Sequence, residues 1–266
     1  MAAGAQIPQP QDIMLSGQRL HFWRGGTGPG LLLLHAAWGD AEMSWRSVWN
    51  QLSTSFMVIA PDLPGFGQSS GLPRPSLSAM SQLLQQLLDA LNVDSVMAVG
   101  NSFGAAVAIQ FAGDFPNTAS QLVLVNGGYM PPVPGLARKL AALPLLNQGF
   151  RLLIRHLSFS SHALKRSFVD APKLPLGFFE KILQYAPVYS KISFDTIMNI
   201  SGPLAKPLVP TLLLWGSQDG LVPLKQAQAL QQWIPGAQLI AIEGAGHMPQ
   251  VERPDEFVAS IVGLRH

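Results

Sequence analysis

The fold of this chain is indicated by residues 96–109, which read Val-Met-Ala-Val-Gly-Asn-Ser-Phe-Gly-Ala-Ala-Val-Ala-Ile. Residues 96–99 are continuously apolar, as is expected of a parallel strand that is covered on both faces. Residues 105–109 are compatible with a helix. The intervening Gly-Asn-Ser-Phe-Gly puts Ser102 on a sharp strand-to-helix turn, where small neighbours let the backbone bend and the hydroxyl stay accessible. Ser102 is therefore a candidate nucleophile.

The same five-residue pattern, Gly-x-Ser-x-Gly, occurs a second time, at residues 67–71. There Ser69 follows a Pro-Gly loop, and Pro73 and Pro75 interrupt any helix after it. Because this copy lacks the strand before it and the helix after it, we assign Ser69 to a loop and keep Ser102 as the nucleophile.

The rest of the chain alternates between strand-like and helix-like segments. Strands are predicted at Gln18–Arg24, Leu31–His35, Met57–Ala60, Val96–Gly100, Gln121–Val125, Thr211–Trp215 and Gln238–Ile242. Helices of the main body are predicted at Leu77–Leu91, Ala105–Ala112, Lys225–Trp233 and Asp255–Leu264. This alternation predicts an α/β fold with a doubly wound parallel sheet, whose functional residues lie at the carboxyl ends of the strands.

The alternation is interrupted over residues 129–206, which hold prolines and helical patterns but no strand pattern. Helices are predicted there at Leu136–Leu143, Phe150–Leu157, His162–Val169, Phe178–Tyr185 and Phe194–Ile200. We predict a helical insertion over 129–206 in a domain formed by residues 1–128 and 207–266. The insertion has ten basic and three acidic residues, a net charge of +7, whereas the remainder has seven and twelve, a net charge of −5.

A histidine and a carboxylate that suit Ser102 follow the last two predicted strands. His247 lies in a glycine-rich loop, Glu-Gly-Ala-Gly-His-Met-Pro, which can bring an imidazole over a distant serine. Asp219 comes 28 residues earlier, in Trp-Gly-Ser-Gln-Asp-Gly, and a carboxylate there would fix the imidazole tautomer. The sequence Asn126-Gly-Gly, after another strand, offers no carboxylate. The alternative interpretations are a histidine on a surface loop and an ordinary Asp-Gly turn.

Taken together, these segments resemble the α/β-hydrolase superfamily, in its capped branch of serine esterases and C–C bond hydrolases. The shared features are Leu-Leu-His at 33–35, Asp-Leu-Pro-Gly-Phe-Gly at 62–67, the turn at 100–104, Trp-Gly-Ser-Gln-Asp at 215–219, Gly-His at 246–247 and Glu-Arg-Pro at 252–254. The resemblance implies a mostly parallel, eight-stranded sheet, with residues 129–206 as a helical cap inserted before the strand that bears the catalytic Asp. It also implies a catalytic triad of Ser102, Asp219 and His247.

Two backbone amides are expected to form an oxyanion hole. The Phe103 amide opens the helix after Ser102, and the resemblance places a second donor at Ala37, two residues after His35. The family usually has His-Gly at 35–36, where this chain has His-Ala, and alanine tolerates a positive φ less well than glycine does. Candidates for lining the substrate pocket are Trp38, Met130 and Met248, whereas His35 ends a strand and is assigned a structural role.

The reaction expected from these residues is acyl transfer to water through an acyl-enzyme on Ser102. The leading substrate class is a small-to-medium hydrophobic carboxylic ester. One alternative is C–C bond hydrolysis of vinylogous diketo acids, or a related lyase reaction on an anionic substrate. That group commonly has a tryptophan after the catalytic histidine, where this chain has Met248. Another alternative is a non-enzymatic small-molecule receptor on the same fold.

The basic residues of the insertion also have more than one interpretation. They solvate its outer face, recognise a substrate carboxylate, or rest on an anionic surface. The residues concerned are Arg138, Lys139, Arg151, Arg155, Lys165 and Arg166.

Composition excludes several other classes of protein. The chain has 266 residues and no cysteine, so disulfides and thiolate chemistry are impossible. A net charge of +2 is too small for a nucleic-acid partner. The longest aliphatic run, residues 31–34, is far shorter than the ~18 residues of a membrane span, and residues 1–11 lack a signal-peptide pattern. We expect a cytoplasmic monomer or homodimer that acts on a small molecule, without stable membrane insertion and without a metal or organic cofactor.

Overall fold

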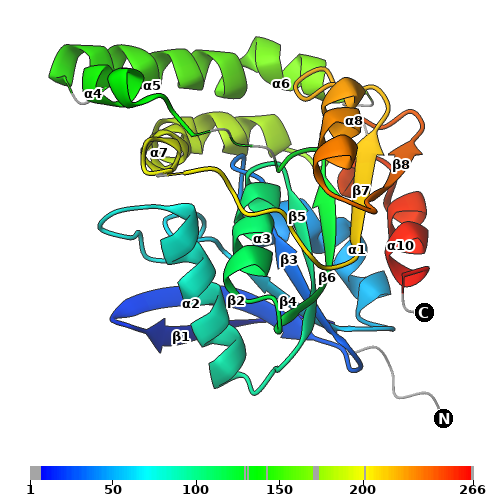
Figure 1. Ribbon diagram of the computed structural model, residues 1–266. Coiled ribbons are helices and arrows are strands. Elements are labelled where there is room, and N and C mark those ends of the chain that lie inside the picture. Colours follow the sequence, from blue (N-terminus) through cyan, green and yellow to red (C-terminus); the bar gives the residue numbers. More distant parts are fainter. Residues whose placement is uncertain are drawn as a thin grey trace.

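The computed structural model describes residues 7–128, 130, 132–141, 143–169, 174–200 and 202–264. Within these residues one sheet has eight strands, in the order β1-β2-β4-β3-β5-β6-β7-β8 (Figure 1). The strands are β1 (Gln9–Leu15), β2 (Gln18–Gly25), β3 (Gly30–Leu34), β4 (Met57–Pro61), β5 (Val96–Asn101), β6 (Ala119–Val125), β7 (Thr211–Gly216) and β8 (Gln238–Ile242). β2 pairs antiparallel with β1 and β4, and all other pairs are parallel. The predicted fold class is confirmed.

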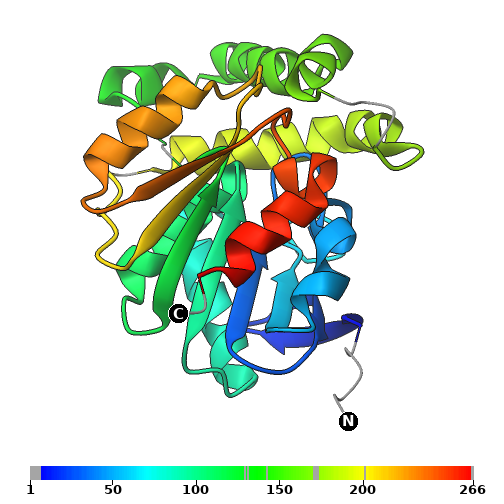
Figure 2. The ribbon, with the colours of Figure 1, turned by 90° about the vertical axis from the view of Figure 1, so that its right-hand side faces the viewer.

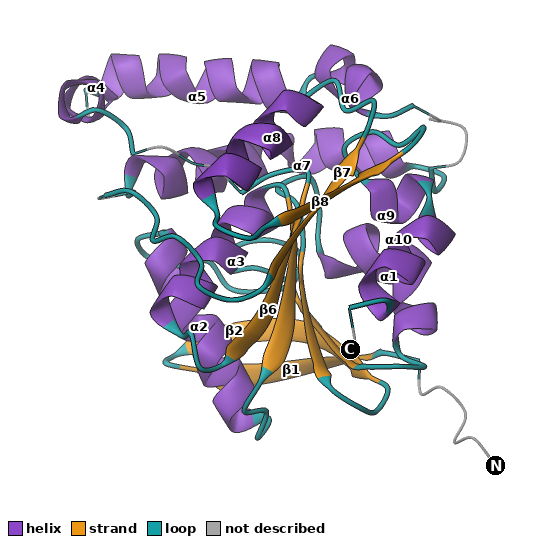
Figure 3. Cartoon of the chain, turned by 45° about the vertical axis from the view of Figure 1, so that its right-hand side comes forward, coloured by secondary structure: helices purple, strands orange, loops and turns teal. Residues whose placement is uncertain are grey.

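Helices cover both faces of the sheet, which explains why its central strands are continuously apolar. Figure 3 shows α2, α3 and α8 on one side and α1, α9 and α10 on the other. These helices are α1 (Ala41–Leu52), α2 (Leu77–Ala90), α3 (Phe103–Asp114), α8 (Leu224–Trp233), α9 (Pro249–Glu252) and α10 (Pro254–Val262). Successive side chains of a strand point to opposite faces. Leu32 and Leu34 of β3 accordingly belong to one core cluster, and Leu31 and Leu33 belong to the other.

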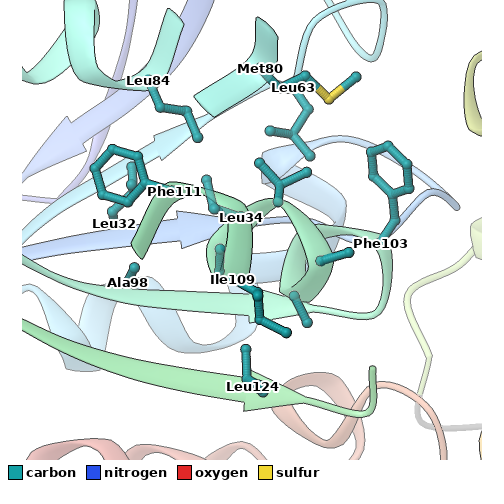
Figure 4. Packing of buried hydrophobic residues seen from close by; sticks show 14 of the residues in the cluster. Leu32, Leu34, Leu63, Met80, Leu84, Ala98, Phe103, Ile109, Phe111 and Leu124 are labelled. Atoms are coloured by element: carbon teal, nitrogen blue, oxygen red, sulfur yellow. The ribbon is translucent and has the colours of Figure 1, made fainter. Parts of the chain in front are cut away.

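The larger of the two clusters lies between the sheet and the helices α2 and α3. Figure 4 shows this packing, with Leu34 from β3 and Leu124 from β6 on the sheet side and Leu84 from α2 on the helix side. All three side chains are at most 1% exposed. Because α3 begins directly after β5, this packing also fixes the turn that carries Ser102.

Two elements near the amino terminus were absent from the sequence-based prediction. β1 is an edge strand whose residues are mostly exposed, so it has no apolar alternation to reveal it. α1 does carry a signal, because Trp45, Val48, Trp49 and Leu52 are buried at helical spacing. The side chain of Asp40 also caps this helix by accepting from the Met43 amide at 2.8 Å.

In the described parts of the chain, four further helices lie between β6 and β7, where a helical insertion was predicted. They are α4 (Gly135–Ala141), α5 (Pro144–Phe159), α6 (Ser161–Ser167) and α7 (Phe178–Met198). Figures 1 and 2 show them as a layer across the carboxyl ends of the parallel strands. None of the helices in the described parts of the chain is both long and apolar enough to cross a bilayer.

The prediction of separate helices at Phe178–Tyr185 and Phe194–Ile200 was wrong, because α7 runs unbroken through Pro187. Proline removes one helical hydrogen bond and usually breaks a helix. Here Pro187 lies on the exposed side, while Ile182 and Tyr189 on the buried side pack into the core. Burial of this apolar face on both sides of the proline holds the two halves in one helix.

Candidate active site

Ser102 occupies a strained turn between β5 and α3. Its φ of 54° and ψ of −110° are unusual for a residue other than glycine, and such strain is typical of functional positions. A Cβ atom at Gly100 would lie 2.3 Å from the Gly104 carbonyl oxygen, and one at Gly104 would lie 2.2 Å from the Leu34 oxygen. Both flanking positions therefore require glycine. The turn is anchored by the Ser102 amide, which donates to the Val125 carbonyl at 2.8 Å.

His247 and Asp219 form a buried pair at the carboxyl ends of β7 and β8. The imidazole Nδ1 lies 2.7 Å from Asp219 Oδ2, and both side chains are at most 1% exposed. A hydrogen bond to a carboxylate requires a proton on Nδ1, so the neutral imidazole carries its lone pair on Nε2. The backbone of His247 is also held, because its amide donates to the Ser167 carbonyl at 2.7 Å and its carbonyl accepts from Asn101 at 3.1 Å.

Asp219 is held as a carboxylate by several donors. Its Oδ1 accepts from the amides of Leu221 (2.8 Å) and Val222 (3.0 Å), and its Oδ2 accepts from the Asn126 side chain at 2.6 Å. Burial alone raises the pKa of Asp219, but the charge of His247 and these hydrogen bonds outweigh burial and hold the pKa below its ordinary value. The group is therefore ionised at neutral pH and can stabilise a positive imidazole.

Ser102 lies in the wall of a cavity of about 190 Å³. The cavity is lined by Ala37, Trp38, Ser102, Phe103, Gly127, Gly128, Met130, Ile154, Ser158, Phe159, Ser193, Ile197, Trp215, Leu221, Val222, Gln226 and Leu230. The Trp38 ring, which lines it, lies 4.8 Å from the His247 ring between centroids. The structure therefore brings Ser102, His247 and Asp219 to one end of the sheet. Within the described residues the Ser102 hydroxyl makes no hydrogen bond to His247. In many enzymes the bond between nucleophile and base is long without substrate and shortens only when substrate binds.

Both predicted oxyanion donors, Ala37 and Phe103, line this cavity beside Ser102. Phe103 is the first residue of α3, so its amide has no partner inside the helix. Ala37 is not among the residues with positive φ, and the alanine at 36 is not either. The loop therefore follows a path that alanine adopts without strain.

A family model described as the alpha/beta hydrolase fold matches residues 29–254 of this chain. The chain belongs to the α/β hydrolases. One relative, 28% identical, is 2-hydroxymuconate semialdehyde hydrolase from Pseudomonas sp. strain CF600, with 95% of this chain and 92% of that protein covered. Lipase 1 from Psychrobacter immobilis is 29% identical, with 95% and 82% covered. The structure of a thermophilic esterase from Thermogutta terrifontis has a TM-score of 0.76 at 24% identity, with 95% and 96% covered, and so has the same fold.

The roof of the cavity in this α/β hydrolase comes from the insertion helices. Ile154, Ser158 and Phe159 belong to α5, and Ser193 and Ile197 belong to α7. No lysine or arginine is among the described residues that line the cavity. The described part of the cavity wall is therefore largely apolar and offers no cationic group to a substrate carboxylate.

The three predicted pocket residues differ in their placement. Trp38 and Met130 line the cavity, and the Trp38 Nε1 also donates to the Ser158 carbonyl of α5 at 2.7 Å. Met248 does not line it: the side chain is 1% exposed and packs in the main core cluster. Met248 is the residue that precedes the short helix α9.

The other candidate side chains have structural partners. His35 is buried, with Nδ1 against the Ala36 carbonyl at 2.7 Å and Nε2 accepting from the Leu63 amide at 2.8 Å, and burial lowers its pKa. Ser69 is also buried, donating to the Asp62 carbonyl at 2.7 Å. Among the described residues no group of three or more His, Asp or Glu side chains is arranged to hold a metal ion.

Proposed function

We propose that this α/β hydrolase is a serine esterase that cleaves small-to-medium hydrophobic carboxylic esters through an acyl-enzyme on Ser102. The observation that supports the proposal is that Ser102 lies on a strained turn in the wall of an apolar cavity. Trp38, which lines the same cavity, packs against the ring of His247, and His247 is bonded to Asp219. In this proposal residues 129–206 act as a cap over residues 1–128 and 207–266, which is supported by the α5 and α7 side chains in the cavity roof.

The first half of the reaction forms the acyl-enzyme. His247 Nε2 removes the Ser102 proton as the hydroxyl oxygen attacks the ester carbonyl, and Asp219 stabilises the resulting imidazolium. The amides of Ala37 and Phe103 donate to the oxyanion of the tetrahedral intermediate. His247 then gives the proton to the departing alkoxide, so that the ester C–O bond breaks and an alcohol leaves.

The second half of the reaction releases the acid. His247 removes a proton from water as the water oxygen attacks the acyl-enzyme carbonyl, and the same two amides hold the new oxyanion. Collapse of this intermediate breaks the bond to the Ser102 oxygen, which takes the proton back from His247. The products are the free carboxylic acid and the restored enzyme.

The absence of lysine and arginine from the described cavity lining favours a neutral ester over an anionic diketo acid. The likeness to Lipase 1 of Psychrobacter immobilis is in line with an ester. The likeness to the semialdehyde hydrolase of Pseudomonas keeps C–C bond hydrolysis as the second candidate. For that reaction, a substrate carboxylate would need a cationic partner, which the described cavity wall lacks.

The deciding experiment is a series of p-nitrophenyl esters of increasing acyl length, run beside a vinylogous diketo acid. We expect turnover of the short esters, and a kcat lower by about a thousandfold or more in Ser102→Ala. Ser69→Ala is the matched control, because Ser69 lies in the same sequence pattern but is bonded to backbone, and it should keep the wild-type kcat at temperatures where it is folded. A strong preference for the diketo acid would favour the second candidate, and no turnover of any substrate would favour a receptor.

A further inference from the structure

The outer surface of the insertion exposes an unusual number of large apolar side chains. We call this set the outer helix face; all its members lie on α4, on α5 or between them, and Leu145 is 85% exposed. The set comprises Leu136, Leu140, Leu143, Leu145, Leu146, Phe150, Leu152, Leu153 and Leu157. Soluble proteins rarely expose large apolar patches, and those that they do expose commonly mark a site of interaction with a protein or a membrane. Figure 2 shows α4–α6 as the outermost layer of the molecule, remote from both termini.

The apolar pattern of α5 is the reverse of that of an ordinary surface helix. Asn147, Arg151, Ile154 and Ser158, spaced by four, three and four residues, are the half-buried residues that face the protein. The leucines at 145–146 and 152–153 lie on the opposite, exposed side. A helix that packs only against its own protein places polar residues outward. The outward leucines therefore leave a large part of their apolar surface exposed.

The charge around these leucines is of one sign. Residues 132–169 hold six lysines and arginines and no aspartate or glutamate. Arg151 is paired with Asp195 at 2.9 Å, and Arg138 donates to the carbonyls of Val133 and Ile200. The exposed remainder, Lys139, Arg155, Lys165 and Arg166, forms no ion pair with the described residues. Exposed cations without an ion pair in the described chain therefore lie on the same helices as the outer helix face (Lys139 and Arg155) and on the next helix, α6 (Lys165 and Arg166).

We propose that the outer helix face docks on an anionic phospholipid surface. Helices that lie in a membrane interface insert leucine and phenylalanine at the headgroup boundary, while lysine and arginine contact the phosphates. A second copy of this chain is a poorer occupant, because two such faces would bring like charges together. Nucleic acid would use the cations but would leave the leucines exposed.

Docking of this kind would place the bilayer close to the proposed site. Ile154 and Ser158, on the inner side of α5, line the cavity that contains Ser102, so a single helix separates the outer helix face from the cavity. Docking depends on the outer helix face and the nearby cations and not on catalysis, so binding to vesicles can be measured without any turnover.

The test is co-flotation with vesicles of pure phosphatidylcholine and of phosphatidylcholine with phosphatidylglycerol. The full chain carrying Ser102→Ala is run in parallel, so that lipid hydrolysis has no part in the result. We expect binding to the anionic vesicles that is about tenfold or more stronger than to the neutral ones and that weakens as salt is raised. The proposed function can fail in the ester assay while this binding persists, and the reverse also holds.

Variants separate the apolar and the charged contributions. Leu152→Gln with Leu153→Gln, and separately Arg155→Gln with Lys165→Gln, should each lower binding by about tenfold or more. Leu208→Gln is the matched control, because Leu208 is 90% exposed outside the outer helix face, and it should bind like the wild type. All of these variants should hydrolyse a soluble ester at the wild-type rate. Equal binding to both vesicle types, no binding to either, or a dimer that the double leucine variant converts to a monomer would overturn the proposal.

Discussion

The side-chain amide of Asn126 donates to the same Asp219 oxygen that accepts from His247, at 2.6 Å, while the Asn126 oxygen accepts from the Gly216 amide at 3.0 Å. Asn126 therefore ties the carboxyl end of β6 to that of β7. It also supplies a neutral donor that stabilises the ionised carboxylate. We regard it as a positioning residue that acts on the reaction through Asp219.

Asn126→Asp should lower kcat at pH 7 by about tenfold or more, with little change in KM. Asparagine and aspartate have the same shape and both tolerate the positive φ of 47° at this position. The new carboxylate would face Asp219 Oδ2, and two adjacent carboxylates cannot both ionise easily, so one pKa rises. The measurement is a pH–rate profile, whose acidic limb should move to higher pH. A variant with unchanged kcat and profile would show that Asn126 has only a structural role.

Asp219→Asn should destabilise the protein at neutral pH and lose part of that effect in acid. The pKa of Asp219 lies below its ordinary value of about 3.9 in the folded state, so its stabilising contribution is present above that value. The contribution is lost as the pH falls through the lower, folded pKa. Urea denaturation at pH 7 and pH 3.5 should therefore show a smaller gap in unfolding free energy between wild type and variant at the lower pH. A gap that stays constant or widens in acid would contradict the assigned direction.

Gly127→Ala should perturb the turn that carries Ser102. A Cβ atom at Gly127 would lie 2.5 Å from the Ser102 Cα. Because that Cα is a main-chain atom and cannot rotate away as a side-chain end can, the turn itself must shift. We expect a loss of roughly 1–3 kcal/mol in stability and a strong loss of kcat. Gly149→Ala is the matched control, because a Cβ there meets nothing within 4 Å and alanine favours the α5 helix by about 0.5–1 kcal/mol. The experiment compares urea midpoints and ester turnover; equal behaviour of the two variants would contradict the close approach.

The candidate reactive groups could be located from sequence because each one follows a recognisable strand. Ser102 directly follows β5, Asp219 and His247 lie in the loops after β7 and β8, and the carboxyl ends of parallel strands meet at one edge of a sheet. Asn126 follows β6 at the same edge, but an asparagine carries no carboxylate and so does not match the pattern of a catalytic acid. The signal that could have identified Asn126 as a partner of Asp219 is that it comes directly after the strand next to β7, which Asp219 follows.

Other features depend on packing that a local pattern does not contain. Met248 directly follows His247, but its side chain packs in the main core cluster and does not line the cavity. Pro187 would end a solitary helix, and only the buried face of α7 explains why the helix continues. The edge strand β1 owes its conformation to its pairing with β2, since its own residues are mostly exposed.

Ile197→Phe should narrow the cavity and change the selectivity for acyl length. Ile197 is a half-buried residue of α7 in the wall of the 190 Å³ cavity, so a larger side chain there takes space from the acyl group. Each methylene that binds in an apolar pocket changes the discrimination between substrates by about 1–3 kcal/mol. The ratio of kcat/KM for the acetate ester to that for the hexanoate ester should therefore rise by about tenfold or more. Val188→Phe is the matched control, because Val188 lies on the same helix, is 51% exposed and does not line the cavity. If both variants keep the wild-type ratio, the acyl chain binds outside this cavity and the proposed pocket is wrong.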